Sequence, residues 1–223
     1  MKMGLMFHRV LPLLSFLLPA YADPGALWKI VHGACVVHVE AHQGPAPCAK
    51  VDLAQHYALM KDRQGVAQYL LIPTVRVSGI ESPDLLARNA PNYWRLAWQG
   101  RRFAMSLAPR KLADGDMSLA INPPWGHTQD QLHIHIDCVA ARVRDLLRGV
   151  KLGQDWRPVT LDGVAYQARN FDMRDNAFVL VAKLAESEHT TMADWSMASV
   201  GADVLLATRR EPAEKLQDVK CGG

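Results

Sequence analysis

The stretch that decides the fold spans residues 122–138 and reads NPPWGHTQDQLHIHIDC. It opens with a Pro-Pro-x-Gly turn and ends in strict alternation, in which His133 and His135 interleave with Ile134 and Ile136. A period of two is typical of a half-buried β-strand, because successive side chains point to opposite faces. The pattern therefore predicts a strand that anchors its isoleucines in the core and presents two imidazoles on its other face.

Three interpretations of His133 and His135 compete. The first is a surface strand whose histidines have no chemical role. The second is a zinc site, because two imidazoles on one strand face offer two ligand nitrogens, but no HExxH or CxxC pattern supplies further ligands. The third is catalysis at phosphorus, in which one histidine attacks and the other handles protons or phosphate oxygens.

The first 22 residues have the composition of a targeting segment. Lys2 and Arg9 provide positive charge, an apolar run follows at 10–18, and Ala20-Tyr21-Ala22 is a small-x-small cleavage motif. We expect residues 1–22 to be a cleaved signal peptide or, if uncleaved, an N-terminal membrane anchor. Residues 23–223 are then expected to form the functional domain, and no stretch of them is apolar and long enough to cross a bilayer.

The charge of the chain argues against a nucleic-acid partner. The formal net charge is +3, and Lys2 and Arg9 in the leader contribute two of these positive charges. A nucleic-acid-binding protein normally has a clear basic excess. A local basic pocket for phosphate groups is still compatible with this balance.

The four cysteines are an even number, and the leader predicts an oxidising compartment, so we expect disulfides. Three pairings are possible. We favour Cys35–Cys48, which closes a short loop, with Cys138–Cys221, which ties the C-terminal tail to the end of the histidine strand. The alternative is four reduced, buried thiols, and the spacing does not favour a zinc site.

Hydrophobic periodicity predicts helices and strands along the whole domain. The expected helices span residues 26–34, 91–107, 139–150 and 176–185, and the expected strands span 66–73, 117–121, 132–136, 164–170 and 196–208, the last broken at 201–203. Asn92 is the expected N-cap of the second helix and Asp137 of the third. Asn122, at a strand end, is expected to present its side chain to a ligand rather than bury it.

The histidine strand resembles that of the histidine triad superfamily of nucleotide hydrolases and transferases. Those proteins carry three histidines alternating with apolar residues, an asparagine eleven positions before the first histidine and a glutamine four positions before it. Asn122 and Gln129 stand at these offsets from His133, so His135 takes the second position, that of the nucleophile. The third position is Asp137, which departs from the superfamily pattern.

Within that superfamily, the chain resembles the bacterial CDP-diacylglycerol pyrophosphatases. The shared features are Gln-x-x-x-His-Ile-His-Ile followed by a small polar residue and Cys138, the turn at 79–83, and the cysteine framework. Arg76 stands three residues after the proline of an Ile-Pro pair, where histidine triad proteins have a histidine that frames the catalytic one. An arginine there can hold a phosphate by a charged, bidentate contact.

The resemblance implies an α+β fold, with a HIT-like antiparallel sheet and flanking helices, and hydrolysis of CDP-diacylglycerol to CMP and phosphatidate without a metal or other cofactor. The C-terminal order of strand, helix and paired strands looks like a degenerate second lobe. The implied catalytic residues are His135, the nucleophile, and His133, and the implied substrate contacts are Asn122, Gln129, Arg76 and Asp137.

The resemblance also implies a location and a partner. The substrate is met at the membrane surface, at the inner membrane facing the periplasm or in the periplasm after cleavage of the leader, and no protein partner is predicted. Two other functions remain open. One is a zinc-dependent periplasmic phosphoesterase with His133 and His135 as ligands. The other is a non-catalytic protein that binds nucleotide or lipid on the same scaffold.

Overall fold

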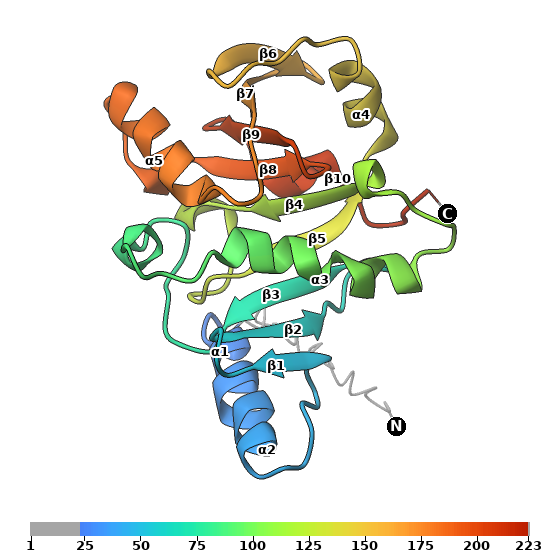
Figure 1. Cartoon of the computed structure of the whole chain (residues 1–223), viewed down its shortest axis with the longest axis vertical. Helices are drawn as coiled ribbons and strands as arrows, with labels where there is room; N and C mark the ends of the chain where they lie inside the picture. The colour runs from blue at the N-terminus through green and yellow to red at the C-terminus, as the bar shows by residue number, and fades with distance from the viewer. Residues whose placement is uncertain (1–22, 223) are drawn as a thin grey trace, which may run out of the picture.

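A single ten-stranded sheet organises the chain, in the order β1-β2-β3-β5-β4-β8-β9-β7-β6, with β10 added beside β5 (Figure 1). The computed structural model describes residues 23–222, so the predicted leader at 1–22 lies outside the described residues. Every strand pair in the sheet is antiparallel. The strands are β1 (Lys50–Asp52), β2 (Tyr57–Lys61), β3 (Tyr69–Pro73), β4 (Met117–Ile121), β5 (Ile134–Val139), β6 (Arg157–Leu161), β7 (Val164–Asn170), β8 (Ser196–Val200), β9 (Val204–Thr208) and β10 (Gln217–Asp218).

Helices cover both faces of this sheet. The chain begins with a continuous helical run, made of α1 (Ala26–Ile30), the π-helical η1 (Val31–Val36) and α2 (Val37–Glu40). The longer helices are α3 (Tyr93–Leu107), α4 (Ala141–Leu147) and α5 (Ala177–Ser187), and the 3₁₀ turns are η2 (Pro83–Leu86), η3 (Asp114–Asp116), η4 (Pro124–Gly126), η5 (Met192–Asp194) and η6 (Ala213–Leu216). Among the residues that the structure describes, no helix is long and apolar enough to span a membrane.

The two halves of the sheet repeat one topology. In the first half the chain order β2, β3, α3, β4, β5 gives the sheet order β2-β3-β5-β4, and in the second half β6, β7, α5, β8, β9 gives β6-β7-β9-β8. The halves meet where β4 pairs with β8. This arrangement confirms the predicted α+β class with an antiparallel sheet, and the second half has the order of the predicted degenerate lobe. The HIT-like assignment itself stays a prediction.

One face of the sheet packs under α3 and α5. The alternation in β5 works as predicted here, because Ile134 and Ile136 are fully buried in the same cluster as the apolar face of α3. Helix α3 lies across β3, β5 and β4 (Figure 1). Gly100 allows this close approach, since a Cβ at this position would lie 2.9 Å from the side chain of Leu59. His135 on β5, and His133 just before it, consequently point to the opposite face.

That opposite face has two separate apolar clusters with a gap between them. At one end, α1 and η1 pack Leu27 and Val31 onto β2 and β3. At the other end, α4 and η6 pack Val143 and Leu216 onto β4, β8 and β9. His135 lies between the two, paired in register with Leu70 of the first cluster on β3 and with Ala120 of the second on β4.

Several local predictions are confirmed and one is wrong. The strand at 117–121 has the predicted bounds, and the Asn92 side chain caps α3 by accepting a hydrogen bond from the Arg95 N–H at 3.0 Å. Asp137 does not cap the next helix. It lies inside β5, and α4 begins later, after Ala140, with no side-chain cap. The strand extends past Asp137 because β4 pairs with Asp137 and Cys138 and β10 pairs with Cys138 and Val139.

Both favoured disulfides are present. Cys35–Cys48 joins the helical run to the turn that precedes β1, and Cys138–Cys221 joins the end of β5 to the C-terminal tail across a sequence separation of 83. Gln217 and Asp218, in β10, pair with the same end of β5. The tail is therefore fixed to the histidine strand both covalently and by backbone hydrogen bonds.

The two disulfides should differ in their effect on stability. We expect Cys138→Ala with Cys221→Ala to lower the free energy of unfolding by about 4 kcal/mol, because a long loop is released in the unfolded chain. The matched control, Cys35→Ala with Cys48→Ala, releases a loop of sequence separation 13 and should lower it by about 3 kcal/mol. Urea unfolding without reductant measures both. A smaller loss for the long-range pair would contradict this account.

Candidate active site

A cavity of about 760 Å³ opens in the gap over β5. One wall is apolar and comes from Leu27 and Ile30 of α1 and from Met60 and Leu70 of the adjacent strands. His135 of β5 and His133, which directly precedes this strand, also line the cavity. The histidine face of the strand is thus not a solvated surface, since the exposed fraction of His135 is 7%.

The polar wall comes from loops that sequence analysis did not single out. Lys61, Asp62 and Arg63 stand at the end of β2, His127 follows η4, and Glu214 belongs to η6. Only the fold brings these three segments together, because 61–63, His127 and Glu214 lie far apart in the sequence. Lys61 Nζ donates to the carbonyls of Asp62 at 2.7 Å and Gly65 at 2.9 Å, whereas Arg63 is exposed, so Arg63 is the cation of this wall best placed to attract a phosphate.

His133 and His135 are adjacent and uncharged. Their ring centroids are 5.1 Å apart, and the rings meet edge to face. The Nδ1 atom of His133 lies 2.7 Å from the carbonyl oxygen of Gln131. Because a carbonyl oxygen only accepts, Nδ1 carries the proton and Nε2 has a free lone pair. Burial lowers the pKa of both imidazoles to about 4, and the nearby His135 contributes to the shift of His133.

Glu214 lies directly against His135. Its Oε1 atom is 3.1 Å from His135 Nε2, but the alignment is not that of a hydrogen bond, and among residues 23–222 both ring nitrogens of His135 lack a hydrogen-bond partner. The Asn122 amide donates to Glu214. Burial raises the pKa of Glu214, although the hydrogen bond from Asn122 opposes this. A carboxyl group with a raised pKa therefore lies next to a neutral imidazole.

Of the four predicted substrate contacts, Gln129 lines the cavity and the other three do not. The Gln129 side chain also holds α1, by accepting from the Leu27 N–H at 3.0 Å and donating to the Asp23 carbonyl at 2.9 Å. Asn122 was expected to be presented to a ligand and is instead buried, at 4% exposure, because the C-terminal segment covers it. Its Oδ1 accepts from the Ala213 N–H at 2.8 Å.

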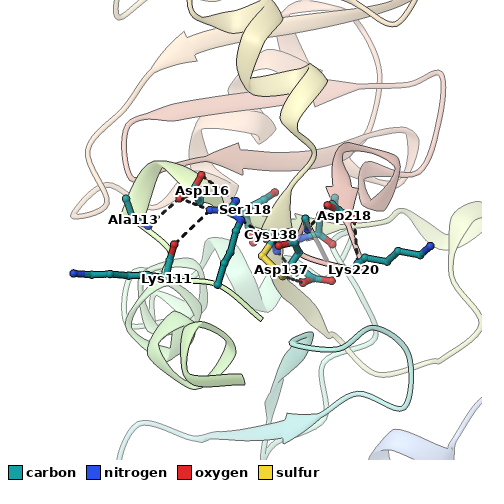
Figure 2. Close-up of a disulfide and its surroundings, with 12 residues drawn as sticks. Lys111, Ala113, Asp116, Ser118, Asp137, Cys138, Asp218 and Lys220 are labelled. Carbon is teal, nitrogen blue, oxygen red and sulfur yellow. Dashed lines mark hydrogen bonds and ion pairs between the residues drawn. A yellow bond between two sulfur atoms is a disulfide. The ribbon is translucent and has the colours of Figure 1, made fainter. Parts of the chain in front are cut away.

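Arg76 and Asp137 lie outside the cavity lining. The guanidinium of Arg76 stacks over the ring of Trp28, 5.2 Å from its centroid. Asp137 is fully buried beside the Cys138–Cys221 disulfide, and its Oδ1 accepts from the Cys138 N–H at 2.8 Å (Figure 2). The two positions that depart from the triad pattern are therefore not in contact with the cavity in this conformation.

Comparison with known proteins places the chain in a family. The family model described as CDP-diacylglycerol pyrophosphatase matches residues 22–222. The CDP-diacylglycerol pyrophosphatase of Yersinia pestis is 38% identical over 220 residues, which is 90% of this chain and 85% of that protein. The chain belongs to the CDP-diacylglycerol pyrophosphatase family. This confirms the resemblance seen in the histidine strand, and it makes the chain a member of a family of hydrolases.

The donor atoms around the two histidines of this family member do not form a recognisable zinc site. Within residues 23–222, the one group of three potential ligands with donor atoms inside 4.8 Å of one another is Asp137, Cys138 and Cys221. The two sulfurs in that group are bonded to each other, so they are not thiolate ligands. A zinc site at His133, His135 and Glu214 would need their donor atoms to come closer together than they are here.

Asp137 should make stability depend on pH. Burial raises the pKa of its carboxyl to about 7, although the Cys138 N–H opposes the shift, whereas the ordinary value is 3.8. A raised pKa in the fold means that this group's contribution is fully present below pH 4 and is lost as the pH rises through 7. We therefore expect Asp137→Asn to raise the free energy of unfolding by about 2–4 kcal/mol at pH 9 and to change it little at pH 4.

Urea unfolding of both proteins across this pH range is the measurement. A gain at pH 4 that equals the gain at pH 9 would show that the effect is packing rather than ionisation. Activity at pH 6 should be largely retained in Asp137→Asn, because the side chain lies outside the cavity lining.

Proposed function

We propose that this protein hydrolyses the pyrophosphate bond of CDP-diacylglycerol to CMP and phosphatidate, with His135 as the nucleophile. The observation that carries the proposal is the pair of neutral imidazoles in a cavity that has an apolar wall and a polar wall with Lys61 and Arg63. The activity named for the family and for the Yersinia pestis relative supports the substrate.

The two walls suit the two ends of this lipid. The apolar wall, with Leu27, Ile30 and Met60, can receive the glycerol backbone and the first methylenes of the acyl chains. Lys61 and Arg63 can bind the pyrophosphate, and Gln129 remains a candidate contact to phosphate or ribose because it lines the same cavity. Direct contact by Asn122 or Arg76 would require release of their present partners, Glu214 and Trp28.

The histidine pair can carry the reaction in two displacements. A neutral imidazole is nucleophilic, and a pKa near 4 keeps His135 neutral throughout the physiological range. His135 attacks the cytidylyl phosphorus and expels phosphatidate, and water then releases CMP from the covalent intermediate. His133 stands beside the nucleophile, with the two ring centroids 5.1 Å apart, where it contacts the transferred phosphate.

The location follows from the substrate and the disulfides. The substrate is a lipid, so we infer that the enzyme meets it at a membrane surface. Two disulfides, Cys35–Cys48 and Cys138–Cys221, favour an oxidising compartment, which fits the periplasmic side of the inner membrane.

The nucleophile is tested with residues 23–223, CDP-diacylglycerol and a chelator. We expect CMP release to survive the chelator, to fall by about 10⁴-fold or more in His135→Ala, and to fall by about 10²–10⁴-fold in His133→Ala. Loss of activity on chelation, with recovery on adding zinc, would favour the zinc-dependent phosphoesterase. Binding of CMP without turnover in the wild type would favour the non-catalytic binding protein.

The cationic wall gives a second test. Arg63→Ala should raise KM for CDP-diacylglycerol about tenfold with little change in kcat, because Arg63 is exposed at the cavity and would bind the anionic group in the ground and transition states alike. Arg148→Ala is the matched control, since Arg148 is exposed on α4, where it pairs with Asp145. Equal changes in both variants would show a general charge effect instead of a binding site.

A further inference from the structure

The two proposed displacements move a proton that neither His133 nor His135 can carry. The oxygen that leaves with phosphatidate gains a proton most easily from an acid, and the water that attacks the intermediate must lose one. His135 is bonded to phosphorus between these events. His133 donates through Nδ1 to the Gln131 carbonyl, and a pKa near 4 makes it a poor store for a proton at neutral pH. Another group at the cavity must therefore hold the proton.

Glu214 is the group whose position and chemistry fit. Its Oε1 lies 3.1 Å from His135 Nε2, the atom that would bond to phosphorus, and its side chain lines the cavity. Burial raises the pKa of Glu214, which favours the protonated form that an acid needs and removes the charge that would repel a phosphate. His127 also lines the cavity, but it packs edge to face against His133, with the two ring centroids 5.9 Å apart.

The fold holds Glu214 firmly although it comes from the C-terminal tail. The turn η6 is fixed at its start by the Asn122 side chain, which accepts from the Ala213 N–H, and at its end by the Ala140 N–H, which donates to the Leu216 carbonyl at 2.9 Å. The next residues form β10 beside β5 (Figure 1). The carboxyl group itself keeps some freedom, because the side chain is 37% exposed toward the cavity.

We propose that Glu214 is the acid–base catalyst of this reaction, a role that rests on the proposed nucleophile His135. In the first displacement, the lone pair of His135 Nε2 forms the bond to the cytidylyl phosphorus, and the bond from phosphorus to the bridging oxygen breaks. That oxygen takes the proton of the Glu214 carboxyl group and leaves with phosphatidate. Glu214 is then a carboxylate.

In the second displacement, the Glu214 carboxylate accepts a proton from a water molecule as the water oxygen attacks phosphorus. The bond from phosphorus to Nε2 breaks, its electron pair returns to His135, and CMP leaves. One water is consumed, and Glu214 regains its proton for the next cycle. The leaving oxygen and the attacking water both lie across the phosphorus from His135. The Glu214 carboxyl group, 3.1 Å from Nε2 before substrate binds, turns away from Nε2 as the phosphorus approaches and serves both displacements from the far side.

The test compares Glu214→Gln with wild type on two substrates. One is CDP-diacylglycerol, and the other is the dinitrophenyl ester of CMP, whose leaving group needs no proton. We expect Glu214→Gln to slow phosphatidate release by about 10²–10⁴-fold. With the ester it should release one equivalent of dinitrophenolate per enzyme at the wild-type rate and then stall, with a cytidylyl group on His135 that mass spectrometry detects. Glu214→Asp should restore part of the turnover.

The controls separate this proposal from the one on which it rests. Glu186→Gln, an exposed glutamate on α5, should behave as wild type with both substrates. His135→Ala should give no burst and no adduct, and CMP release that persists in His135→Ala would overturn the nucleophile itself. Glu214→Gln enzyme that turns over the ester without accumulating the adduct, or that loses both substrates equally through KM alone, would overturn the acid–base role and leave Glu214 a structural residue.

Discussion

The antiparallel pairing of β5 between β3 and β4 is the constraint on which the rest of the structure depends. It sets the register that places Ile134 and Ile136 under α3 and turns His135 to the opposite face, between Leu70 and Ala120. A shift of one residue would exchange the two faces and bury the imidazoles in the apolar core. Because the isoleucines are fully buried, that shift is strongly disfavoured. Packing in the core therefore fixes the position of the His135 side chain.

The site works by controlling charge in a partly buried place. Desolvation holds His133 and His135 in their neutral forms and raises the pKa of Glu214, so the three groups beside the proposed phosphorus position carry less charge than they would in water. Lys61 and Arg63 line the same cavity, and Arg63 is exposed to solvent. This distribution of charge would let the cavity attract an anionic headgroup while the proposed nucleophile stays unprotonated.

The duplicated topology explains why the active half needs the tail. The second half repeats the order of strands and helix, but β9, the counterpart of β5, carries only Val204, Leu205, Leu206, Ala207 and Thr208, so it supplies no ionisable group. The second half instead continues the sheet, because β8 pairs with β4, and it leads the chain into η6 and β10. The Cys138–Cys221 disulfide then fixes that tail at the end of β5, which keeps Glu214 against His135.

The sequence by itself determined the features that depend on near neighbours: the alternation in 132–136, the cap at Asn92, the strand at 117–121, and, by motif, the family. It failed where long-range pairing decides the outcome. Asp137 was expected to begin a helix, yet β4 and β10 hold it in a strand. Glu214 and its partner Asn122 are 92 positions apart, and no local pattern marks either contact. Only the tertiary structure determined which residues form the polar wall. Contacts between distant segments arise from the order of the strands and from packing, and neither the hydrophobic period nor local secondary-structure propensity contains that information.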